Sequence, residues 1–570
     1  MNNAKVIAQT LKKTGVSCVY LYPGGTIAPL LDELIKQGIQ YICAKTEQGA
    51  GYMAIAAAKV LGEPQVVMVT SGPGVTNLIT PVADAYYDSV PLLILTGQVG
   101  TSSVNTQKKL RQTGFQETDA VGLYKNVTKK SYMATVDDDM GALVLESFMF
   151  AKTGRFGPVH LDLPMDVQKN EIEQSSNDFG IETSCINEIP ENTWINLRTL
   201  ISNASRPIIL AGNGVILSSA VPAFRKMVEA LCIPVVSSMP AVGVLAKTDQ
   251  NYIGYIGHTG EYYANLTLQH SDLVLVLGSR LDLRQRGTEI DAFKKNKKII
   301  RVDIDENELK HGEVTVDISI ESDLNAFIEQ FLKRDFPRKI GIECWMNKIA
   351  NWKEKFSSSQ FYNSEKLTGK SIIEKVSELT EDRDVVVTSG VGCHQQFVAR
   401  YFNFDYPSRK WLTSSGHGTM GYDLPANLGA IINSSSSTFG LVFVGDGSIQ
   451  MNIQELATLS ELNLPVKIFV LDDSSLNLVA QFQNMTWGSA PSTEKKLSPN
   501  FYRIAKAYGI DSYIIESNRE VNDVLKRVLS NNKPCLVHCI LKEKEDVLPM
   551  LLGGQKLSEM YPFNGEVFYE

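Results

Sequence analysis

Residues 441–473, LVFVGDGSIQMNIQELATLSELNLPVKIFVLDD, restrict the possible fold more than any other stretch of this chain. They read as an apolar strand, a Gly-Asp-Gly turn, a helix and a second apolar strand that ends on Asp472 and Asp473. The 24 residues between Gly447 and Asp472 (448–471) are enough for one crossover helix and one strand. Because parallel strands present their carboxyl ends at one edge of a sheet, we expect the turn and the final aspartates to meet there.

The same order of parts occurs earlier, in VVMVTSGPGVTNLITPVADAYYDSVPLLILTG at residues 66–97. Strand-like and helix-like runs alternate along almost the whole chain, which indicates an α/β protein with open parallel sheets covered by helices. Polar, aperiodic stretches near residues 168–192 and 355–369 divide the 570 residues into thirds. We expect domains at 1–168, 190–335 and 365–550 and a tail at 551–570, with the outer two domains sharing one fold. A chance likeness remains the alternative, because strand–glycine–helix units are common.

Composition narrows the class of ligand. A formal net charge of −8 and a pI near 5.6 offer no basic surface for nucleic acid or an anionic membrane, so a small-molecule ligand is expected. The sequence has no apolar run of membrane-spanning length and begins without the features of a signal peptide, so a cytoplasmic location is expected. Cys535, His538 and Cys539 in PCLVHCI fit a buried strand better than a metal site.

The Gly-Asp-Gly turn suggests a metal-bridged diphosphate. Gly445 and Gly447 would let backbone N–H groups face an anion at a helix start, whereas the carboxylate of Asp446 would repel that anion. A divalent cation, Mg²⁺ by its preference for oxygen ligands, would resolve the conflict, with Asp473 as a second ligand. The plainer alternative is a tight turn and a solvated strand end; the spacing favours the metal.

These residues resemble the metal–diphosphate signature of thiamine diphosphate enzymes, in the version found in acetohydroxyacid (acetolactate) synthase catalytic subunits. The resemblance extends to YPGGTIAPLLDEL, EQGAGYMAIAAAK, FQETD, GRFGPVHLDLPMDV, GSRLDLR and GTMGYDLPANLGA. It implies a pyrimidine-binding domain, a central flavin-type domain and a diphosphate-binding domain. It also implies metal ligation by Asp446, Asp473 and the backbone oxygen of Ser475. Family members commonly carry Asn where Asp473 stands, so the preferred metal is open.

The resemblance assigns further cofactor contacts. Glu47 would hydrogen-bond the aminopyrimidine ring of thiamine diphosphate, although a helix-capping role is the simpler alternative. Met420 would be the apolar wedge under the bent cofactor, where a core methionine is the alternative. The segments around the diphosphate contain His394, Gln395, Gly418, Gly445, Gly447 and Ser448. Because Glu47 and the Gly-Asp-Gly turn lie in different domains, the family pattern implies a homodimer with shared sites; a tetramer stays open.

The central third resembles the flavin-binding segments of the same family. The matching positions are Arg155, Gly212, Gly214, Arg280, Asp303 and Asp317. This implies bound FAD that does no net redox work. The seven histidines include no adjacent pair of the kind that simple thiamine-dependent decarboxylases carry, so release of a free aldehyde is disfavoured. A pyruvate oxidase-like reaction and a non-catalytic binding homologue remain lesser alternatives.

Carboligation is the expected reaction, with pyruvate as donor and a ketone as acceptor. Gly25, Phe115 and Gln116 match positions in the substrate region of the family. Six residues are candidates on the acceptor side, as departures from the family or as charges on a lengthened loop: Met165, Phe482, His417, Lys108, Lys109 and Arg111. Met165 stands where the family has a lysine, and Phe482 stands where it has a tryptophan. These two losses, together with the basic loop, would suit a nucleotide-linked keto-deoxysugar as acceptor, as in yersiniose-type branched-sugar pathways. We expect such an acceptor; acetolactate formation from a second 2-keto acid is the main alternative.

Overall fold

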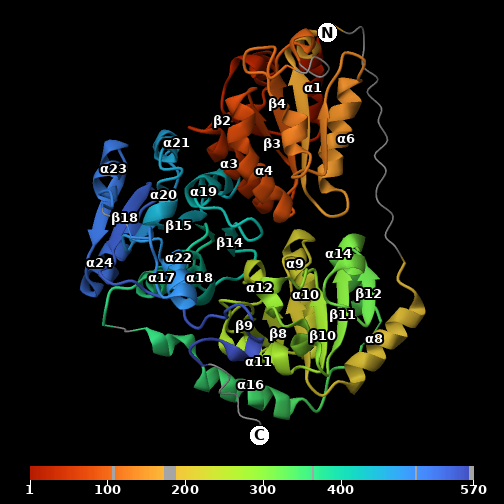
Figure 1. Cartoon of the computed structure of the whole chain (residues 1–570), viewed down its shortest axis with the longest axis vertical. Coiled ribbons are helices and arrows are strands. Elements are labelled where there is room, and N and C mark those ends of the chain that lie inside the picture. Colours follow the sequence, from red (N-terminus) through yellow and green to blue (C-terminus); the bar gives the residue numbers. More distant parts are fainter. Residues whose placement is uncertain (105–109, 172–187, 335, 363–364, 495–496, 564–570) are drawn as a thin grey trace.

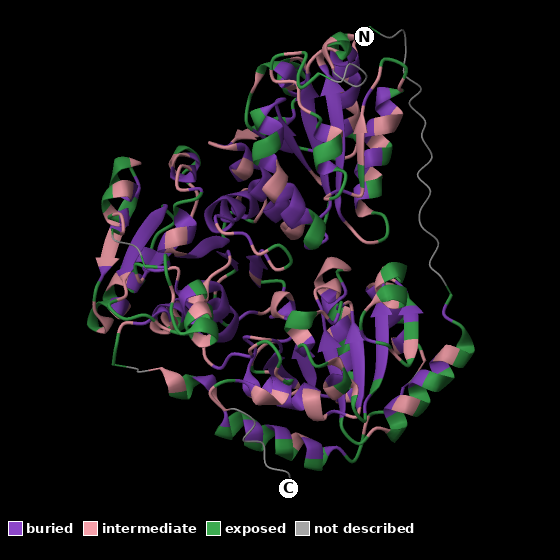
Figure 2. Ribbon diagram, in the orientation of Figure 1, coloured by how far each residue is buried: buried purple, intermediate pink, exposed green. Residues whose placement is uncertain are grey.

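The computed structural model describes residues 1–104, 110–171, 188–334, 336–362, 365–494 and 497–563. The described chain contains three six-stranded sheets whose paired strands all run parallel, each flanked by helices (Figure 1). The predicted fold class is therefore confirmed. Figure 2 shows the central strands of the sheets buried and the outward faces of the surrounding helices exposed, whereas several edge strands are partly exposed. None of the described helices is both long and apolar enough to cross a membrane.

The first sheet has the strand order β2-β1-β3-β4-β6-β5. Its strands are β1 (Cys18–Leu21), β2 (Gln40–Cys43), β3 (Gln65–Val69), β4 (Leu92–Gln98), β5 (Lys130–Met133) and β6 (Pro158–Pro164). Its helices are α1 (Asn3–Lys13), η1 (Gly25–Ile27), α2 (Ala28–Lys36), α3 (Glu47–Leu61), α4 (Pro73–Tyr87), η2 (Thr101–Ser103), α5 (Ala120–Tyr124), α6 (Met140–Lys152) and α7 (Met165–Lys169).

The middle sheet has the order β12-β11-β10-β7-β8-β9, the arrangement of a doubly wound dinucleotide fold. Its strands are β7 (Pro207–Ala211), β8 (Val235–Ser237), β9 (Tyr252–Tyr255), β10 (Leu273–Leu277), β11 (Lys298–Asp303) and β12 (Ile318–Glu321). Its helices are α8 (Glu191–Asn203), α9 (Gly214–Leu217), α10 (Val221–Leu231), η3 (Met239–Ala241), α11 (Tyr262–His270), α12 (Leu283–Arg286), α13 (Ile290–Lys294), α14 (Glu306–His311), α15 (Leu324–Leu332), α16 (Glu343–Lys355) and η4 (Ser358–Phe361).

The third sheet has the order β14-β13-β15-β16-β18-β17. Its strands are β13 (Val385–Ser389), β14 (Arg409–Thr413), β15 (Phe439–Gly445), β16 (Val466–Asp472), β17 (Asp511–Ile515) and β18 (Cys535–Ile540). Its helices are α17 (Gly369–Leu379), α18 (Cys393–Tyr401), α19 (Asp423–Ile432), α20 (Asp446–Ile449), α21 (Glu455–Leu462), α22 (Asn477–Trp487), α23 (Phe501–Ala507) and α24 (Asn518–Leu529), with η5 (Leu557–Glu559) near the chain end. Counted from its own first strand, this order is the same as that of the first sheet, which confirms the predicted likeness of the outer thirds.

Helix α3 joins the first and third sheets into one core. It begins at an N-cap, Thr46, whose hydroxyl accepts the N–H of Gly49, and it ends at Gly62 in the left-handed region (φ 70°). Between these ends, its Gly- and Ala-rich sequence is buried on all sides, as expected of a helix covered on every face. Its small side chains let α19 approach so closely that a Cβ built on Gly429 would lie 2.1 Å from the carbonyl oxygen of Met53.

The segment after the third sheet returns to the middle domain. Leu551 donates its N–H to the carbonyl of His258 (2.7 Å), and Tyr262 donates its hydroxyl to the carbonyl of Ser558 (2.8 Å). Phe563 stacks on Tyr262 with 4.7 Å between ring centroids. Residues 541–563 therefore fasten the third domain to the middle one.

The contact between α3 and α19 gives a stability prediction. Gly429→Ala should destabilise the protein by about 1–3 kcal/mol, because the new methyl group meets the backbone of Met53, which cannot rotate away. The midpoint of thermal unfolding should fall accordingly. Gly553→Ala is the matched control, since a Cβ at Gly553 has no neighbour within 4 Å. Equal midpoints for the two variants would contradict the proposed tightness of this contact.

Candidate active site

The two acidic ends of residues 441–473 meet at the carboxyl edge of the third sheet. Strands β15 and β16 are parallel neighbours with Gly445 opposite Leu471, as expected from the sequence. Asp446 begins α20 directly after β15, and Asp473 follows β16. Both line one pocket of about 730 Å³. The other predicted residues that line it are Gly445, Gly447, Ser448, Ser475, His394 and Met420.

The neighbouring aspartates at the end of β16 have different surroundings. The carboxylate of Asp472 faces His538 Nε2 at 2.8 Å and accepts the hydroxyl of Ser498 at 2.7 Å. Asp473 lines the pocket, and its Oδ1 accepts the N–H of Ser475 at 3.0 Å. His538 lies on the buried strand β18, as expected for PCLVHCI, and is used as a structural partner of Asp472. Only Asp473 of the pair is placed to share a ligand with Asp446.

The loop after β13 forms the opposite wall of the pocket. Gly392 (φ 151°) turns the chain into α18, and a Cβ at that position would lie 2.6 Å from the His394 ring. The ring in turn lies against Gly445, where a Cβ would be 3.2 Å from Nδ1. Its Nε2 lies 3.1 Å from Asp423 Oδ1. The two glycines therefore let the imidazole pack against the backbone, and Gly392, His394 and Gly445 together form a cradle in the pocket wall that suits a diphosphate group.

Asp423 links this wall to the Gly-Asp-Gly turn. Its carboxylate accepts the N–H of Gly390 and, at 2.5 Å, the hydroxyl of Ser448. Ser448 in turn accepts the N–H of Gly421 at 2.8 Å. Asp423 was not among the predicted site residues, although its place in GYDLP, next to the predicted wedge Met420, was an available signal.

The remaining predicted contacts of the third domain divide into two groups. Met420 lines the pocket and is half-buried. Gln395 and Gly418 do not line it: Gln395 donates to Thr413 Oγ1 (2.7 Å) and to the carbonyl of Ser414 (3.0 Å), and Gly418 (φ 73°) supplies a left-handed turn before Met420. These two residues support the segment that carries Met420.

Glu47 and three other predicted residues lie at the carboxyl edge of the first sheet. Gly25 follows β1, Glu47 follows β2, and Phe115 and Gln116 follow β4. Glu47 is buried, and its Oε2 accepts Asn77 Nδ2 at 3.1 Å. The cap of α3 is Thr46, so Glu47 is not used as a cap. None of these four described residues lines the pocket at the third sheet of the same chain.

The loop after β4 presents an aromatic side chain outward. Phe115 is 87 % exposed, whereas Gln116 adopts a positive φ of 64° and packs beside Gly72, where a Cβ would lie 2.9 Å from the Gln116 Cβ. A positive φ in a residue other than glycine stores backbone strain, which is common at functional sites. Lys108 and Lys109 lie outside the described residues, and Arg111 is exposed.

The other acceptor-side candidates lie on different elements. Met165 is half-buried at the start of α7, at the same sheet edge as the loop after β4. Phe482 lies on α22, is 48 % exposed and meets Trp487 edge-on with 5.6 Å between ring centroids. Trp487, itself 65 % exposed, was not singled out from the sequence. His417 stacks on Tyr87 of α4 at 5.5 Å.

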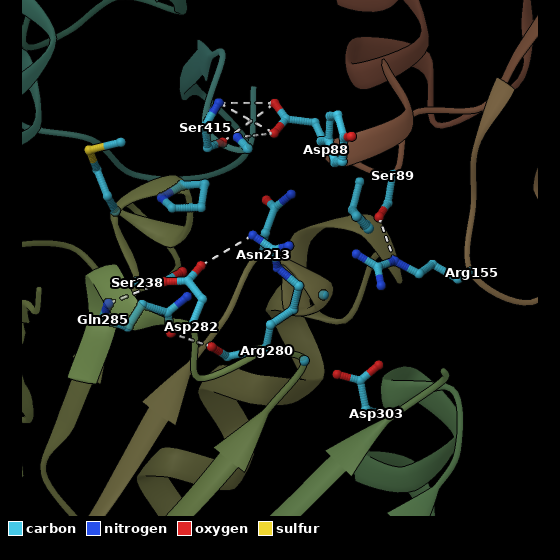
Figure 3. Close-up of a pocket in the computed structure, with 18 of the residues that line it drawn as sticks. Asp88, Ser89, Arg155, Asn213, Ser238, Arg280, Asp282, Gln285, Asp303 and Ser415 are labelled. Carbon is cyan, nitrogen blue, oxygen red and sulfur yellow. Dashed lines mark hydrogen bonds and ion pairs between the residues drawn. The ribbon is translucent and has the colours of Figure 1, made fainter. Parts of the chain in front are cut away.

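A second, larger cavity of about 1300 Å³ lies where the three domains meet (Figure 3). Asp88, Ser89 and Arg155 reach it from the first domain, Ser415 from the third, and the other labelled residues from the middle domain. Of the residues predicted to bind flavin, Arg155, Gly214, Arg280 and Asp303 line it. Its floor is the carboxyl edge of the middle sheet, where dinucleotides bind in this fold.

Two predicted flavin residues lie elsewhere. Gly212 does not line the cavity; it lets two loops approach, since a Cβ there would be 2.1 Å from the carbonyl oxygen of Gly278. Asp317 precedes β12 at the opposite edge of the sheet and pairs with Lys298 Nζ at 2.8 Å. The carboxylate that follows β12 and lines the cavity is that of Asp323, the N-cap of α15, which was not among the predicted residues.

The polar groups of this cavity suit a large polar ligand. Arg155 pairs with Asp305 (3.0 Å) and Glu308 (2.9 Å), so the first domain is held to the middle one at the rim. Burial raises the pKa of Asp303 above its ordinary value, although the N–H of Asp305 and the charge of Arg301 oppose that rise. Ser238 Oγ is buried and lacks a hydrogen-bond partner among the described residues, which leaves a polar atom for a ligand.

Comparisons with known proteins agree with this arrangement. Models of the thiamine pyrophosphate enzyme family match in order: the N-terminal TPP binding domain over residues 1–123, the central domain over 196–331 and the C-terminal TPP binding domain over 390–539. The chain is 36 % identical over 565 residues to the acetolactate synthase large subunit of Lactococcus lactis subsp. lactis (strain IL1403), covering 98 % of this chain and 96 % of that protein.

Two further relatives cover similar lengths. The acetolactate synthase isozyme 3 large subunit of Escherichia coli (strain K12) is 34 % identical over 98 % of each chain. The mitochondrial acetolactate synthase catalytic subunit of Saccharomyces cerevisiae (strain ATCC 204508 / S288c) is 31 % identical over 100 % of this chain and 84 % of its own. The chain therefore belongs to the acetolactate synthase large-subunit family of thiamine pyrophosphate enzymes.

Proposed function

We propose that this protein is a thiamine diphosphate- and Mg²⁺-dependent carboligase that decarboxylates pyruvate and transfers the two-carbon unit to a second 2-keto acid, as an acetolactate synthase does. The observation that carries the proposal is the meeting of Asp446 and Asp473 at one pocket, beside the glycine cradle of His394 and Gly445. The names of the relatives favour a keto acid as the acceptor.

The donor groups of the pocket fit the cofactor. Asp446, Asp473 and the backbone oxygen of Ser475 would hold Mg²⁺, since all three offer oxygen ligands. The cradle beside His394, together with Gly447 and Ser448, would receive the diphosphate. When bound, thiamine diphosphate supplies the nucleophilic carbon and the electron sink that decarboxylation of a 2-keto acid needs. Met420 would press against its apolar face.

Glu47 would supply the acid–base group. Because Glu47 and the diphosphate pocket lie at separate sheet edges of one chain, we propose that the pocket is completed by Glu47 of the partner subunit in a homodimer. Exposed apolar side chains support this, since Phe115, Met451 and Trp487 are each more than half exposed in the single chain. A buried carboxyl group beside the pyrimidine ring would exchange a proton with its nitrogen.

We propose FAD for the large cavity, held by Arg155, Gly214, Arg280, Asp303 and Asp323. Its lining includes the carboxyl edge of the doubly wound middle sheet, the place where dinucleotides bind in this fold. Joining two 2-keto acids with loss of carbon dioxide transfers no electrons in net, so the flavin would have a structural role. Electron transfer in a pyruvate oxidase-like reaction is the outcome that would contradict this role.

A nucleotide-linked keto-deoxysugar is the second candidate acceptor. It is favoured by the departures at Met165 and Phe482 and by the exposed Arg111, which together would widen the acceptor side and add positive charge for a phosphate. The comparisons give the sugar no support, and the 2-keto acid is the acceptor that we propose.

Glu47→Gln should lower kcat by about a hundredfold or more while leaving the fold and cofactor binding intact, because it removes only the acid–base function of an already buried side chain. Turnover of pyruvate, measured beside calorimetric titration of thiamine diphosphate, checks this. Glu63→Gln is the control, an exposed carboxylate beyond the other end of α3. Near wild-type turnover of Glu47→Gln would disprove its assignment.

The shared site can be tested by complementation. Asp446→Ala alone should lose turnover through weaker cofactor retention, because the diphosphate loses its metal bridge. Glu47→Gln and Asp446→Ala chains, co-expressed with different affinity tags and purified in tandem, should give heterodimers with about half of the wild-type activity, since one of the two sites is then intact. Heterodimers as inactive as their parents would place each site within one chain.

Analysis of the reaction products identifies the acceptor. With pyruvate alone, mass spectrometry should find acetolactate, and added nucleotide-linked keto-deoxysugars should leave its yield unchanged. Arg111→Gln should leave the KM for pyruvate unchanged, because the exposed charge of Arg111 is not needed to hold a small keto acid. A branched sugar product, with little acetolactate from pyruvate alone, would favour the second candidate instead.

A further inference from the structure

A buried ionic cluster joins the first domain to the segment that carries Met420. Lys59 lies near the end of α3, Asp84 lies in the last turn of α4, and Asp88 is the C-cap of α4. Lys59 Nζ donates to Asp88 Oδ2 and to the carbonyl of Thr413, both at 2.8 Å. The Lys59 and Asp88 side chains are only 12 % and 4 % exposed, so this ion pair is largely removed from solvent.

The carboxylates of the cluster hold the loop that follows β14. Asp88 Oδ1 accepts the N–H of Gly416 at 2.7 Å, and the hydroxyl of Ser414 donates to Asp84 Oδ1. Ser414 Oγ also accepts the N–H of Thr419 at 2.9 Å, which closes the loop just before Met420. The loop 413–420 is thus held by side chains of a different domain.

The same loop separates the two sites. Ser415 and Gly416 line the large cavity together with Tyr87 and Asp88, as Figure 3 shows for Ser415 and Asp88, whereas Met420 lines the diphosphate pocket. A Cβ on Gly416 would lie 2.8 Å from the Tyr87 Cβ, so the loop has little freedom to shift on α4. A displacement of the cluster would therefore move residues that line both cavities.

The charges of the cluster are unequal, with two carboxylates facing one ammonium group. Burial alone would lower the pKa of Lys59, yet Asp88, Tyr422 and Asp84 hold it above its ordinary value. Burial and the charge of Asp88 raise the pKa of Asp84 to about 7, against the opposing effects of Lys59, Ser414 and Thr419. Lys59 therefore stays charged near neutral pH, whereas Asp84 changes its charge there.

Around Asp84, three polar atoms make no hydrogen bond of ordinary geometry with the described residues, although Thr419 still lies close enough to Asp84 and Tyr52, and Lys59 to Tyr422, to shift the pKa values of these groups. They are Asp84 Oδ2, Thr419 Oγ1 and Tyr422 OH, all buried. A proton on Asp84 Oδ2 would turn that oxygen into a donor beside these acceptors. The other groups that face Asp84 are Lys59 and Tyr52 from α3 and Asp88 from α4, and Tyr52 meets Tyr422 edge-on at 5.6 Å.

We propose that Lys59, Asp84 and Asp88 form a positioning cluster that holds the 413–420 loop, so that one set of buried contacts aligns Met420 in the diphosphate pocket and the loop wall of the large cavity. The proposal rests on the proposed function, because it takes the two cavities as the thiamine diphosphate and flavin sites. Lys59 and Asp84 line neither cavity and act only through the loop, whereas Asp88 also lines the large cavity.

Two isosteric variants test the cluster. Asp88→Asn keeps an oxygen for the Gly416 N–H and removes the charge that pairs with Lys59, whereas Asp84→Asn keeps the acceptor for Ser414 and removes the titration. Asp32→Asn, in an exposed pair with Lys36 on α2, is the control in the same domain. If Asp88→Asn does not fold, Ser414→Ala is the substitute variant, because it removes the hydroxyl that links Asp84 to the N–H of Thr419.

The readouts are the near-ultraviolet circular dichroism of bound thiamine diphosphate, the fluorescence of bound flavin, and kcat against KM. In Asp88→Asn or Ser414→Ala both spectra should change together and kcat should fall about ten- to a hundredfold, since the loop is misplaced while the pyruvate contacts remain. Asp32→Asn should match the wild type. Lower thermal stability with both spectra and kcat unchanged would mean that the cluster is merely structural and would overturn the proposal.

The pH dependence gives a separate readout. Burial favours the neutral form of Asp84 in the folded state and raises its pKa to about 7. The contribution of Asp84 to folding stability is therefore present at low pH and is lost as the pH rises through about 7. The two spectra should therefore change near pH 7 in the wild type and not in Asp84→Asn. An identical transition in both proteins would overturn the role of Asp84. Since neither spectrum requires turnover, absence of carboligation with intact spectral coupling would count against the proposed function alone.

Discussion

Close packing of α3 against α19 is the contact on which the rest of the molecule depends. Helix α3 is rich in glycine and alanine, and its backbone at Met53 lies against Gly429 of α19. This contact makes one core from the first and third sheets. Because it fixes how these sheets lie against each other, it also fixes where Lys45, just before α3, and Lys59, near its end, meet the third domain. A buried packing contact thus sets the geometry of charged groups at both of its ends.

The large features could be predicted from the sequence because they depend on periodicity and on the parallel sheet. Alternating strands and helices indicate α/β domains, and the spacing from the Gly-Asp-Gly turn to Asp473 places both at one sheet edge. The likeness between residues 66–97 and 441–473 correctly indicates that two sheets share one strand order. These inferences need only local sequence and the geometry of parallel strands.

The finer details depend on contacts between segments far apart in the chain. The local sequence does not distinguish Asp472 from Asp473, yet Asp472 pairs with His538 whereas Asp473 lines the pocket. Asp317 and Asp323 are six positions apart, but β12 lies between them and carries them to opposite edges of the sheet. Lys59 on its own looks like a solvated helix end; only the loop after β14 makes it a buried ion-pair partner.

The shared strand order has a consequence for how the chain uses its two similar halves. Helices α3 and α19 each follow the second strand of their own sheet, so the chain contains an internal pseudo-dimer whose equivalent helices pack on each other. Each of these helices begins with an acid, Glu47 in one and Asp423 in the other. Asn77 contacts the first, whereas His394 and Ser448 engage the second. Topologically equivalent positions of the two halves thus carry carboxylates in different surroundings: Glu47 accepts a hydrogen bond from Asn77, whereas Asp423 joins His394 and Ser448 in one wall of the diphosphate pocket.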